Sequence, residues 1–195
     1  MSMKPPLHGS DNILLPDLSG KKNAPLIAYE LMWRNKKNKM PMYLGNGAES
    51  STFLLKPVNG VGPELILKVP CKALKPGVIK NRISFENKVL SQLRKLDCFE
   101  AAKGTILTIS NAQNACNYWP DMVGSRVMVR AKGQLAAEFI EDGESIEPEL
   151  RLEFAQKFLE ACFVLWNKSL VHTDLKPGNI MLDLGNKDLQ IIDLD

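Results

Sequence analysis

The chain has 195 residues, 45% of them hydrophobic, with a formal net charge of +3 and four scattered cysteines. This length is enough to bury a sizeable core in one domain or two small lobes. The near-neutral charge excludes nucleic acid as the expected partner, and no apolar run approaches the roughly 20 residues that a membrane span needs. The cysteines show no C-x-x-C spacing, so we expect free thiols without a metal role.

The start of the chain is rich in Pro, Gly, Ser, Asn and Lys, which predicts a flexible leader over residues 1–25. Such a leader is typical either of a secretion signal or of a flexible extension without a specific role. Residues 26–32 favour a short helical turn, and the basic run at 34–39 is typical of a solvated surface. The regular fold is expected from residue 42 onward.

Short apolar runs separated by turns then predict an antiparallel sheet, with two helices interrupting it. The apolar residues recur at helical spacing over residues 79–96 and again over 150–165. Strands are expected at 52–55, 65–69, around 106, and at 127–129, 135–140, 180–182 and 189–192. A Gly-Asn turn joins the last two strands.

The strongest functional signal is the run Val171-His172-Thr173-Asp174-Leu175-Lys176-Pro177-Gly178-Asn179-Ile180, followed after the hairpin by Ile191-Ile192-Asp193. Transfer of a γ-phosphoryl group needs a carboxylate to orient the acceptor, a cation near the phosphate, and oxygen ligands for Mg²⁺. Asp174, Lys176, Asn179 and Asp193 supply these groups at matching intervals. The run resembles the catalytic loop and metal-binding motif of the protein-kinase superfamily.

Four further elements fit the same resemblance. The segment with Gly45, Asn46, Gly47 and Ser50 resembles the kinase glycine-rich loop, in which backbone N–H groups approach phosphate oxygens without a Cβ in the way. By itself, an ordinary hairpin turn would explain it equally well. The strand ending at Lys68 resembles the one whose lysine holds the α- and β-phosphates.

Glu86 falls on the apolar stripe of the first predicted helix, together with Ile83 and Leu90. A carboxylate that faces a core needs a cation, because burying it unpaired is unfavourable. Lys68 is the expected partner, and the alternative is that Glu86 lies at the edge of the stripe in water.

The segment from Leu135 to Glu144 is similar to the kinase hinge. By that resemblance Ala137 is the gatekeeper, the backbone of Glu138 and Ile140 hydrogen-bonds adenine, and Glu144 reaches the ribose. A plain surface loop is the alternative.

The resemblance implies an α+β, minimal two-lobed protein-kinase-like fold, with an antiparallel N-lobe sheet, one N-lobe helix and a strongly reduced helical C-lobe. We expect a leader and short helix over residues 1–40, the N-lobe over 41–137, and the hinge and C-lobe over 138–195. The implied cofactors are ATP and Mg²⁺. Thr173 stands where kinases regulated by phosphorylation carry an arginine, and Leu194-Asp195 replaces the Phe-Gly of the metal-binding motif.

With these departures, the sequence resembles the minimal effector kinases of the HopBF, OspG and NleH kinds, which bacterial pathogens inject into eukaryotic cells by type III secretion. The resemblance implies a monomeric serine/threonine-protein kinase that is secreted into the host cytoplasm as a virulence factor, with a host protein as substrate. A heat-shock chaperone is the candidate target. We expect no membrane insertion.

Two other functions remain open. Small-molecule kinases of the aminoglycoside or choline type also show H-x-D-x-x-x-x-N followed by Ile-Asp-x-acid, which residues 192–195 fit. Lys176 argues against them, because such enzymes seldom carry lysine at that position. A pseudokinase that only binds a partner is the second alternative, but it need not keep Lys68, Glu86, Asp174 and the metal-binding residues together.

Overall fold

The computed structural model describes residues 13–16, 26–35, 40–41, 43–46, 50–70, 75–85, 88, 93, 104–106, 125–143 and 145–193. The chain forms two compact units. Unit 1 comprises Met1–Ser91 and Lys103–Arg130, and unit 2 comprises Gln92–Ala102 and Ala131–Asp195. The division after Arg130 falls earlier than the lobe boundary expected after residue 137.

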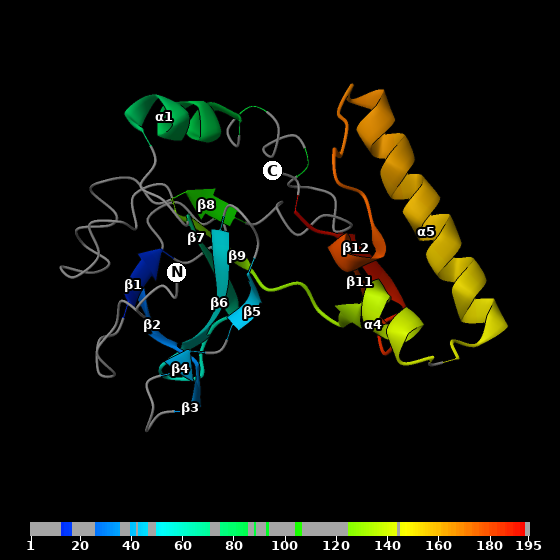
Figure 1. The fold of residues 1–195 in the computed structure, drawn as a ribbon, viewed down its shortest axis with the longest axis horizontal. Helices are drawn as coiled ribbons and strands as arrows, with labels where there is room; N and C mark the ends of the chain where they lie inside the picture. Colours follow the sequence, from blue (N-terminus) through cyan, green and yellow to red (C-terminus); the bar gives the residue numbers. More distant parts are fainter. Residues whose placement is uncertain are drawn as a thin grey trace. The chain divides into compact units, whose positions relative to one another are not determined.

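Unit 1 is built on a curled antiparallel sheet of seven strands, drawn in blue to green in Figure 1. Its strands are β1 (Ile13–Pro16), β2 (Leu26–Leu31), β5 (Tyr43–Asn46), β6 (Ser50–Pro57), β7 (Leu65–Pro70), β8 (Gly104–Ile106) and β9 (Arg126–Val129). The order is β1-β2-β6-β7-β9-β8, and β5 also pairs with β6. β2 pairs with the second half of β6 and β5 with its first half, so both lie along one edge of that strand. A separate hairpin pairs β3 (Trp33–Asn35) with β4 (Met40–Pro41).

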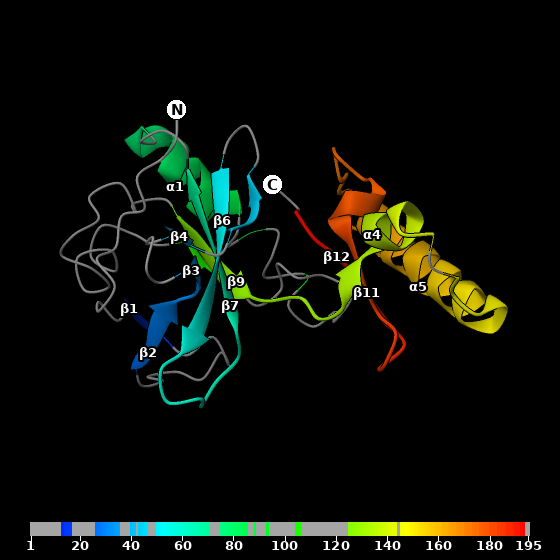
Figure 2. The same cartoon turned by 60° about the horizontal axis from the view of Figure 1, so that its bottom comes forward.

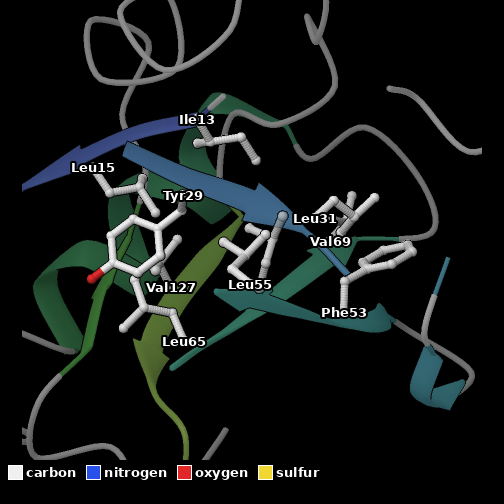
Figure 3. Close-up of a cluster of buried hydrophobic side chains, with 10 residues drawn as sticks. Ile13, Leu15, Tyr29, Leu31, Phe53, Leu55, Leu65, Val69 and Val127 are labelled. Atoms are coloured by element: carbon white, nitrogen blue, oxygen red, sulfur yellow. The ribbon is translucent and has the colours of Figure 1, made fainter. Parts of the chain in front are cut away.

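Alternation along these strands buries one set of side chains in a single apolar cluster. Figure 3 shows this cluster, to which five strands contribute. It consists of Ile13, Leu15, Tyr29, Leu31, Phe53, Leu55, Leu65, Leu67, Val69 and Val127. The opposite set is smaller and contains Leu54, Ile66 and Met128. Burial on both faces explains why β6 and β7 read as nearly continuous apolar runs.

The N-terminal prediction was wrong for the residues that the structure describes. Ile13–Pro16 and Leu26–Leu31 are paired strands rather than a flexible leader and a helical turn. Their alternation is visible once the pairing is known, because Tyr29 and Leu31 are buried while Glu30 is exposed. The proline at the end of β1 is tolerated because β1 is an edge strand.

The first predicted helix is confirmed over its beginning. Helix α1 spans Pro76–Phe85. Proline is favourable at its first position, because the N–H that proline lacks would have no intrahelical acceptor there. Most of the predicted continuation to residue 96, including Glu86, lies outside the described residues.

Unit 2 consists of a three-stranded sheet with helices beside it, as Figures 1 and 2 show in yellow to red. Its elements are β10 (Gln134–Leu135), α4 (Ala136–Glu141), α5 (Pro148–Asn167), the 3₁₀ turn η4 (Pro177–Asn179), β11 (Ile180–Asp183) and β12 (Asp188–Ile191). β11 is the central strand, antiparallel to both β10 and β12. The second long helix and the closing hairpin are therefore confirmed.

Together the two units make the mixed α+β architecture of a small kinase-like fold, with an antiparallel sheet and few helices. None of the helices that the structure describes is both long and apolar enough to cross a membrane. Cys162 is a free thiol, and the other three cysteines lie outside the described residues.

Candidate active site

The predicted catalytic loop lies between α5 and β11, and its first end is fixed by the way α5 stops. Ser169 adopts the left-handed conformation at φ 54°. Its N–H donates to Trp166 O at 2.9 Å, and the N–H of Leu170 donates to Leu165 O at 2.9 Å. This is the Schellman pattern, which satisfies the last carbonyls of a helix and turns the chain sharply. The turn delivers the chain directly into His172.

The other end of the loop is fixed by the hairpin β11–β12 and its packing on α5. The turn is held by Asp183, whose Oδ2 accepts from Asn186 Nδ2 at 2.7 Å and whose Oδ1 accepts from the Asn186 N–H at 3.1 Å. These bonds to Asn186 hold the pKa of Asp183 below its usual value. Lys157 on α5 donates to Lys187 O and lies 3.8 Å from Asp188. The hairpin is thus tied to the helix that precedes the loop.

His172 links the loop to the strand that leads into Asp193. The N–H of Asp174 donates to His172 Nδ1 at 3.2 Å, so Nδ1 is the accepting nitrogen. The other ring nitrogen, Nε2, therefore carries the hydrogen and donates to Ile192 O at 2.9 Å. One imidazole ring sets both the backbone at Asp174 and the backbone immediately before Asp193.

Asp174 presents an exposed carboxylate inside a small hydrogen-bonded cluster. Its Oδ2 accepts from Lys176 Nζ at 2.6 Å and from Asn179 Nδ2 at 3.2 Å. The bond from Lys176 is the main reason that the pKa of Asp174 lies below its ordinary value; desolvation opposes the shift. Asp174 is therefore ionised at neutral pH, with a cation directly beside it.

Asn179 is buried, with only 6% of its surface exposed, and its contacts orient it firmly. Its Nδ2 donates to Asp174 O at 2.8 Å, while its own backbone N–H donates to Lys176 O at 2.8 Å. Because the amide nitrogen is held by Asp174, the amide oxygen is the side-chain atom left to bind a cation.

Asn179 and Asp193 are brought together by the pairing of the closing hairpin. Ile180 pairs with Ile191, and the N–H of Ile192 donates to Asn179 O at 2.9 Å. Asp193 follows directly, at φ 65°. This left-handed backbone is uncommon for a residue other than glycine, and such conformations cluster at functional sites.

The donor set of this pair fits Mg²⁺, which binds through one or two protein oxygens and takes its other ligands from phosphates and water. Within the described ranges no group of three or more His, Cys, Asp or Glu side chains could hold a metal by itself. A site of one amide and one carboxylate would therefore need a ligand such as a nucleotide polyphosphate to complete it.

Unit 1 carries the predicted phosphate-binding residues on its sheet. Lys68 lies near the end of β7, paired with Thr52 on β6 and with Arg126 on β9. Gly45 pairs with Thr52, and Ser50 begins β6. Asn46 pairs with Ser51 beside them. Gly47 and Glu86 lie outside the described residues. The roles assigned to all of these residues stay predictions.

Arg126 is a residue that the sequence reasoning missed. It is 6% exposed and lies directly opposite Lys68, so two cations share one face of the sheet. The only available signal was a basic residue at the start of the apolar strand β9, which also describes many solvated strand ends. The folded sheet therefore places a buried guanidinium directly beside the lysine that the sequence assigned to phosphate binding.

The strand predicted over residues 135–140 is wrong beyond Leu135. Ala136–Glu141 is helix α4, with Phe139 buried and Ile140 exposed. Ala and Glu are strong helix formers, and this local preference outweighs the strand-like appearance of a short apolar run. The carbonyl of Glu138 accepts from the N–H of Asp142 at 2.8 Å as part of the helix end.

Helix α4 removes the basis for treating Ala137 as a gatekeeper and Glu138 and Ile140 as an adenine-binding strand. Glu144, the predicted ribose contact, lies outside the described residues.

The described connection between the units runs instead from Arg130 to Gly133. Arg130 is anchored in unit 1, where its N–H donates to Glu64 O at 2.9 Å and its Nη1 lies 2.6 Å from Glu64 Oε2. Lys56 lies 2.8 Å from the other oxygen of that carboxylate, and its hydrogen bond is the main cause that lowers the pKa of Glu64. Gly133 is anchored in unit 2, where it approaches the backbone at Leu182.

A comparison with known proteins concerns the C-terminal part of the chain, which contains the predicted catalytic loop. Residues 123–195 match the model of the phosphotransferase enzyme family, APH. No curated protein matches the chain. The matched segment contains β9, the connection between the units, and all residues from His172 to Asp193, that is, the predicted catalytic loop and the closing hairpin. The match and the loop geometry together support a kinase-like phosphotransferase.

Proposed function

We propose that this protein transfers the γ-phosphate of ATP to a hydroxyl group in a Mg²⁺-dependent reaction. The observation that carries the proposal is the cluster of Asp174, Lys176 and Asn179, held next to Asp193 by the closing hairpin. It supplies an ionised carboxylate, a cation and two oxygen ligands within one short segment, as phosphoryl transfer requires.

In this proposal each residue has a separate task. The carboxylate of Asp174 accepts a hydrogen bond from the acceptor hydroxyl, orients it toward the γ-phosphorus, and takes up its proton as the new P–O bond forms and the bond to ADP breaks. Lys176 stabilises negative charge on the transferred group. Asn179 and Asp193 would hold Mg²⁺, which neutralises phosphate charge when bound. The resemblance to kinases assigns Lys68 and the backbone around Gly45 to the remaining phosphates.

We propose a serine or threonine hydroxyl of a protein as the acceptor. The support is Lys176, which protein kinases carry two residues after the catalytic aspartate and which lies 2.6 Å from Asp174 here. A small-molecule hydroxyl is the second candidate, favoured by the family match over residues 123–195. The resemblance to effector kinases further suggests a host protein as substrate, a heat-shock chaperone among the candidates, and secretion into the host cytoplasm.

Labelled ATP tests both levels of this proposal. The purified chain is incubated with γ-labelled ATP, Mg²⁺ and either a eukaryotic lysate or a panel of amino sugars and amino alcohols. Label in proteins, lost in Asp174→Asn and retained in the matched variant Asp142→Asn, supports a protein kinase. Asp142 is an exposed carboxylate at the end of α4, away from the loop in sequence. Label confined to small molecules supports the second candidate. Nucleotide binding without transfer to either pool would refute phosphotransfer and indicate a pseudokinase.

A further inference from the structure

Helix α5 is apolar on two opposite faces. One face packs into unit 2 through Phe154, Ala161 and Leu165, all buried, and α5 contacts β12, which lies beside it in Figures 1 and 2. The other face carries four large apolar side chains that are mostly exposed to solvent. Their exposed fractions are 62% for Leu152, 65% for Leu159, 65% for Phe163 and 81% for Trp166.

These four side chains form one continuous stripe, which we call the α5 stripe. With 3.6 residues per turn, the four positions fall within about 60° of one another around the helix. Leu152, Leu159 and Trp166 are spaced by sevens, which is the spacing of a helix that packs along another helix. Single exposed apolar residues are ordinary, but an aligned set of this size is typical of an interaction surface, and Trp and Phe are enriched at such surfaces.

The charges beside the α5 stripe indicate what it binds. Glu149, Glu153 and Glu160 lie roughly 70–110° to one side of the centre of the stripe on the helical wheel. Glu153 is 3.6 Å from Lys187, whereas Glu149 and Glu160 are exposed. The flank nearest the stripe on this side is therefore acidic, and a partner with basic residues along the matching edge would complement it.

The same charges disfavour an antiparallel second copy of this chain as the occupant. When two identical helices pack antiparallel about a twofold axis through Leu159, each flank meets its own copy. Glu160 would then approach the Glu160 of the other copy, and like charges at a helix interface are destabilising.

We propose that the α5 stripe docks an amphipathic helix of another protein, with the apolar face of that helix flanked on one side by lysine or arginine. This interaction surface is separate from the residues assigned to phosphotransfer. Its test uses binding alone, so its outcome does not depend on the proposed enzymatic activity.

The first experiment asks whether the stripe is open in the full chain. A variant with Trp33→Phe and Trp119→Phe keeps Trp166 as the sole tryptophan. Its fluorescence should be red-shifted and freely quenched by acrylamide, and sedimentation should report a monomer. Protection of Trp166 in the free monomer would mean that another part of this chain covers the stripe. A dimer that dissociates on Leu159→Glu would mean that a second copy does, and either result overturns the proposal.

The second experiment measures docking with synthetic helices of about five turns, or roughly 18 residues. One peptide carries leucine along one face with lysine on one flank, and its matched control carries glutamate on that flank. The lysine peptide should shift the Trp166 emission to the blue. It should bind about fourfold more tightly than the glutamate peptide, or more, since the rim pairs to Glu149 and Glu160 contribute roughly twofold each. Added salt should reduce this difference.

Variants then assign the binding to the α5 stripe. Leu159→Glu should abolish binding of the lysine peptide, whereas Val61→Glu makes the same change at a 74% exposed apolar residue of unit 1 and should leave binding unchanged. Glu160→Lys should move the preference toward the glutamate peptide. The proposal would be overturned if both peptides bound equally well, or if Leu159→Glu and Val61→Glu reduced peptide binding equally. It would also be overturned if neutral lipid vesicles, instead of the peptide, produced the blue shift.

Discussion

Replacing Gly133 with alanine tests the close backbone approach that anchors the connection between the units onto unit 2. Gly133 has φ +93°, and a Cβ built there would lie 2.1 Å from Leu182 O, 2.4 Å from Leu182 C and 2.7 Å from Asp183 N. All three atoms belong to the backbone of β11, the central strand of its sheet, so no side chain can rotate to make room. The strand or the connection must move.

The magnitude follows from two separate penalties. A left-handed backbone at a residue with a Cβ is unfavourable by about 1–2 kcal/mol, and overpacking that forces backbone shifts adds about 1–3 kcal/mol. We therefore expect Gly133→Ala to lower the free energy of unfolding by roughly 2–5 kcal/mol, a large part of the ~5–15 kcal/mol typical of a natural protein. At about 2–4 °C per kcal/mol for a chain of this size, the melting temperature falls by roughly 4–20 °C.

Two other glycines separate the penalties. Gly143 has φ +65° and open space around its Cβ position, so Gly143→Ala should lose only the backbone part, about 1–2 kcal/mol. Gly77 lies in α1 with nothing near its Cβ position, so Gly77→Ala should stabilise by about 0.5–1 kcal/mol. Thermal and denaturant unfolding, followed by circular dichroism, give the three values. If Gly133→Ala loses no more stability than Gly143→Ala, the close approach to β11 is refuted.

Three further predictions concern the candidate active site. Lys176→Ala removes the main cause that lowers the pKa of Asp174, so this pKa rises toward its ordinary value and the acidic fall in the rate moves to higher pH. An unmoved acidic limb in the pH–rate profile would contradict this. His172→Phe removes two hydrogen bonds that hold the loop, so kcat should fall about tenfold or more while the far-UV circular dichroism spectrum is retained. An unchanged kcat would show that the loop does not need the imidazole ring. Lys68→Met should weaken ATP binding but leave adenosine binding unchanged in calorimetry, because in the proposed site only the phosphates contact the lysine. An equal loss of affinity for both ligands would point to a general defect of unit 1.

The elements that the sequence predicted correctly are those whose signal is local. Helix α5 follows from apolar residues at helical spacing, and β6, β7, β11 and β12 follow from short apolar runs bounded by turn residues. The hydrogen bonds of the segment from His172 to Asp193 join residues no more than 20 positions apart, and the functional roles assigned to its side chains stay predictions. Residue type and spacing within one short segment contain most of that information.

The errors have different physical causes. The pairing of β2 with β6 joins Tyr29 to Pro57, and such long-range contacts leave no trace in local composition. Helix α4 was misread because a short, mostly apolar run resembles a strand, while its Ala and Glu content favours a helix. Arg126 could be recognised only from its register opposite Lys68 and its burial, both of which require the folded sheet.

The hydrogen bonds of unit 2 also explain how the loop keeps its conformation without the arginine that Thr173 replaces. In kinases regulated by phosphorylation, new charge-assisted bonds from a phosphate order the catalytic segment. Here His172 spans from the N–H of Asp174 to the carbonyl of Ile192, and Asn179 binds Asp174 through its side chain and Ile192 through its backbone. Each of these bonds lies within unit 2, and none involves Thr173, whose side chain is exposed. In this structure the backbone around the proposed acceptor-orienting and metal-binding residues is therefore held by hydrogen bonds within the loop and between the loop and the closing hairpin.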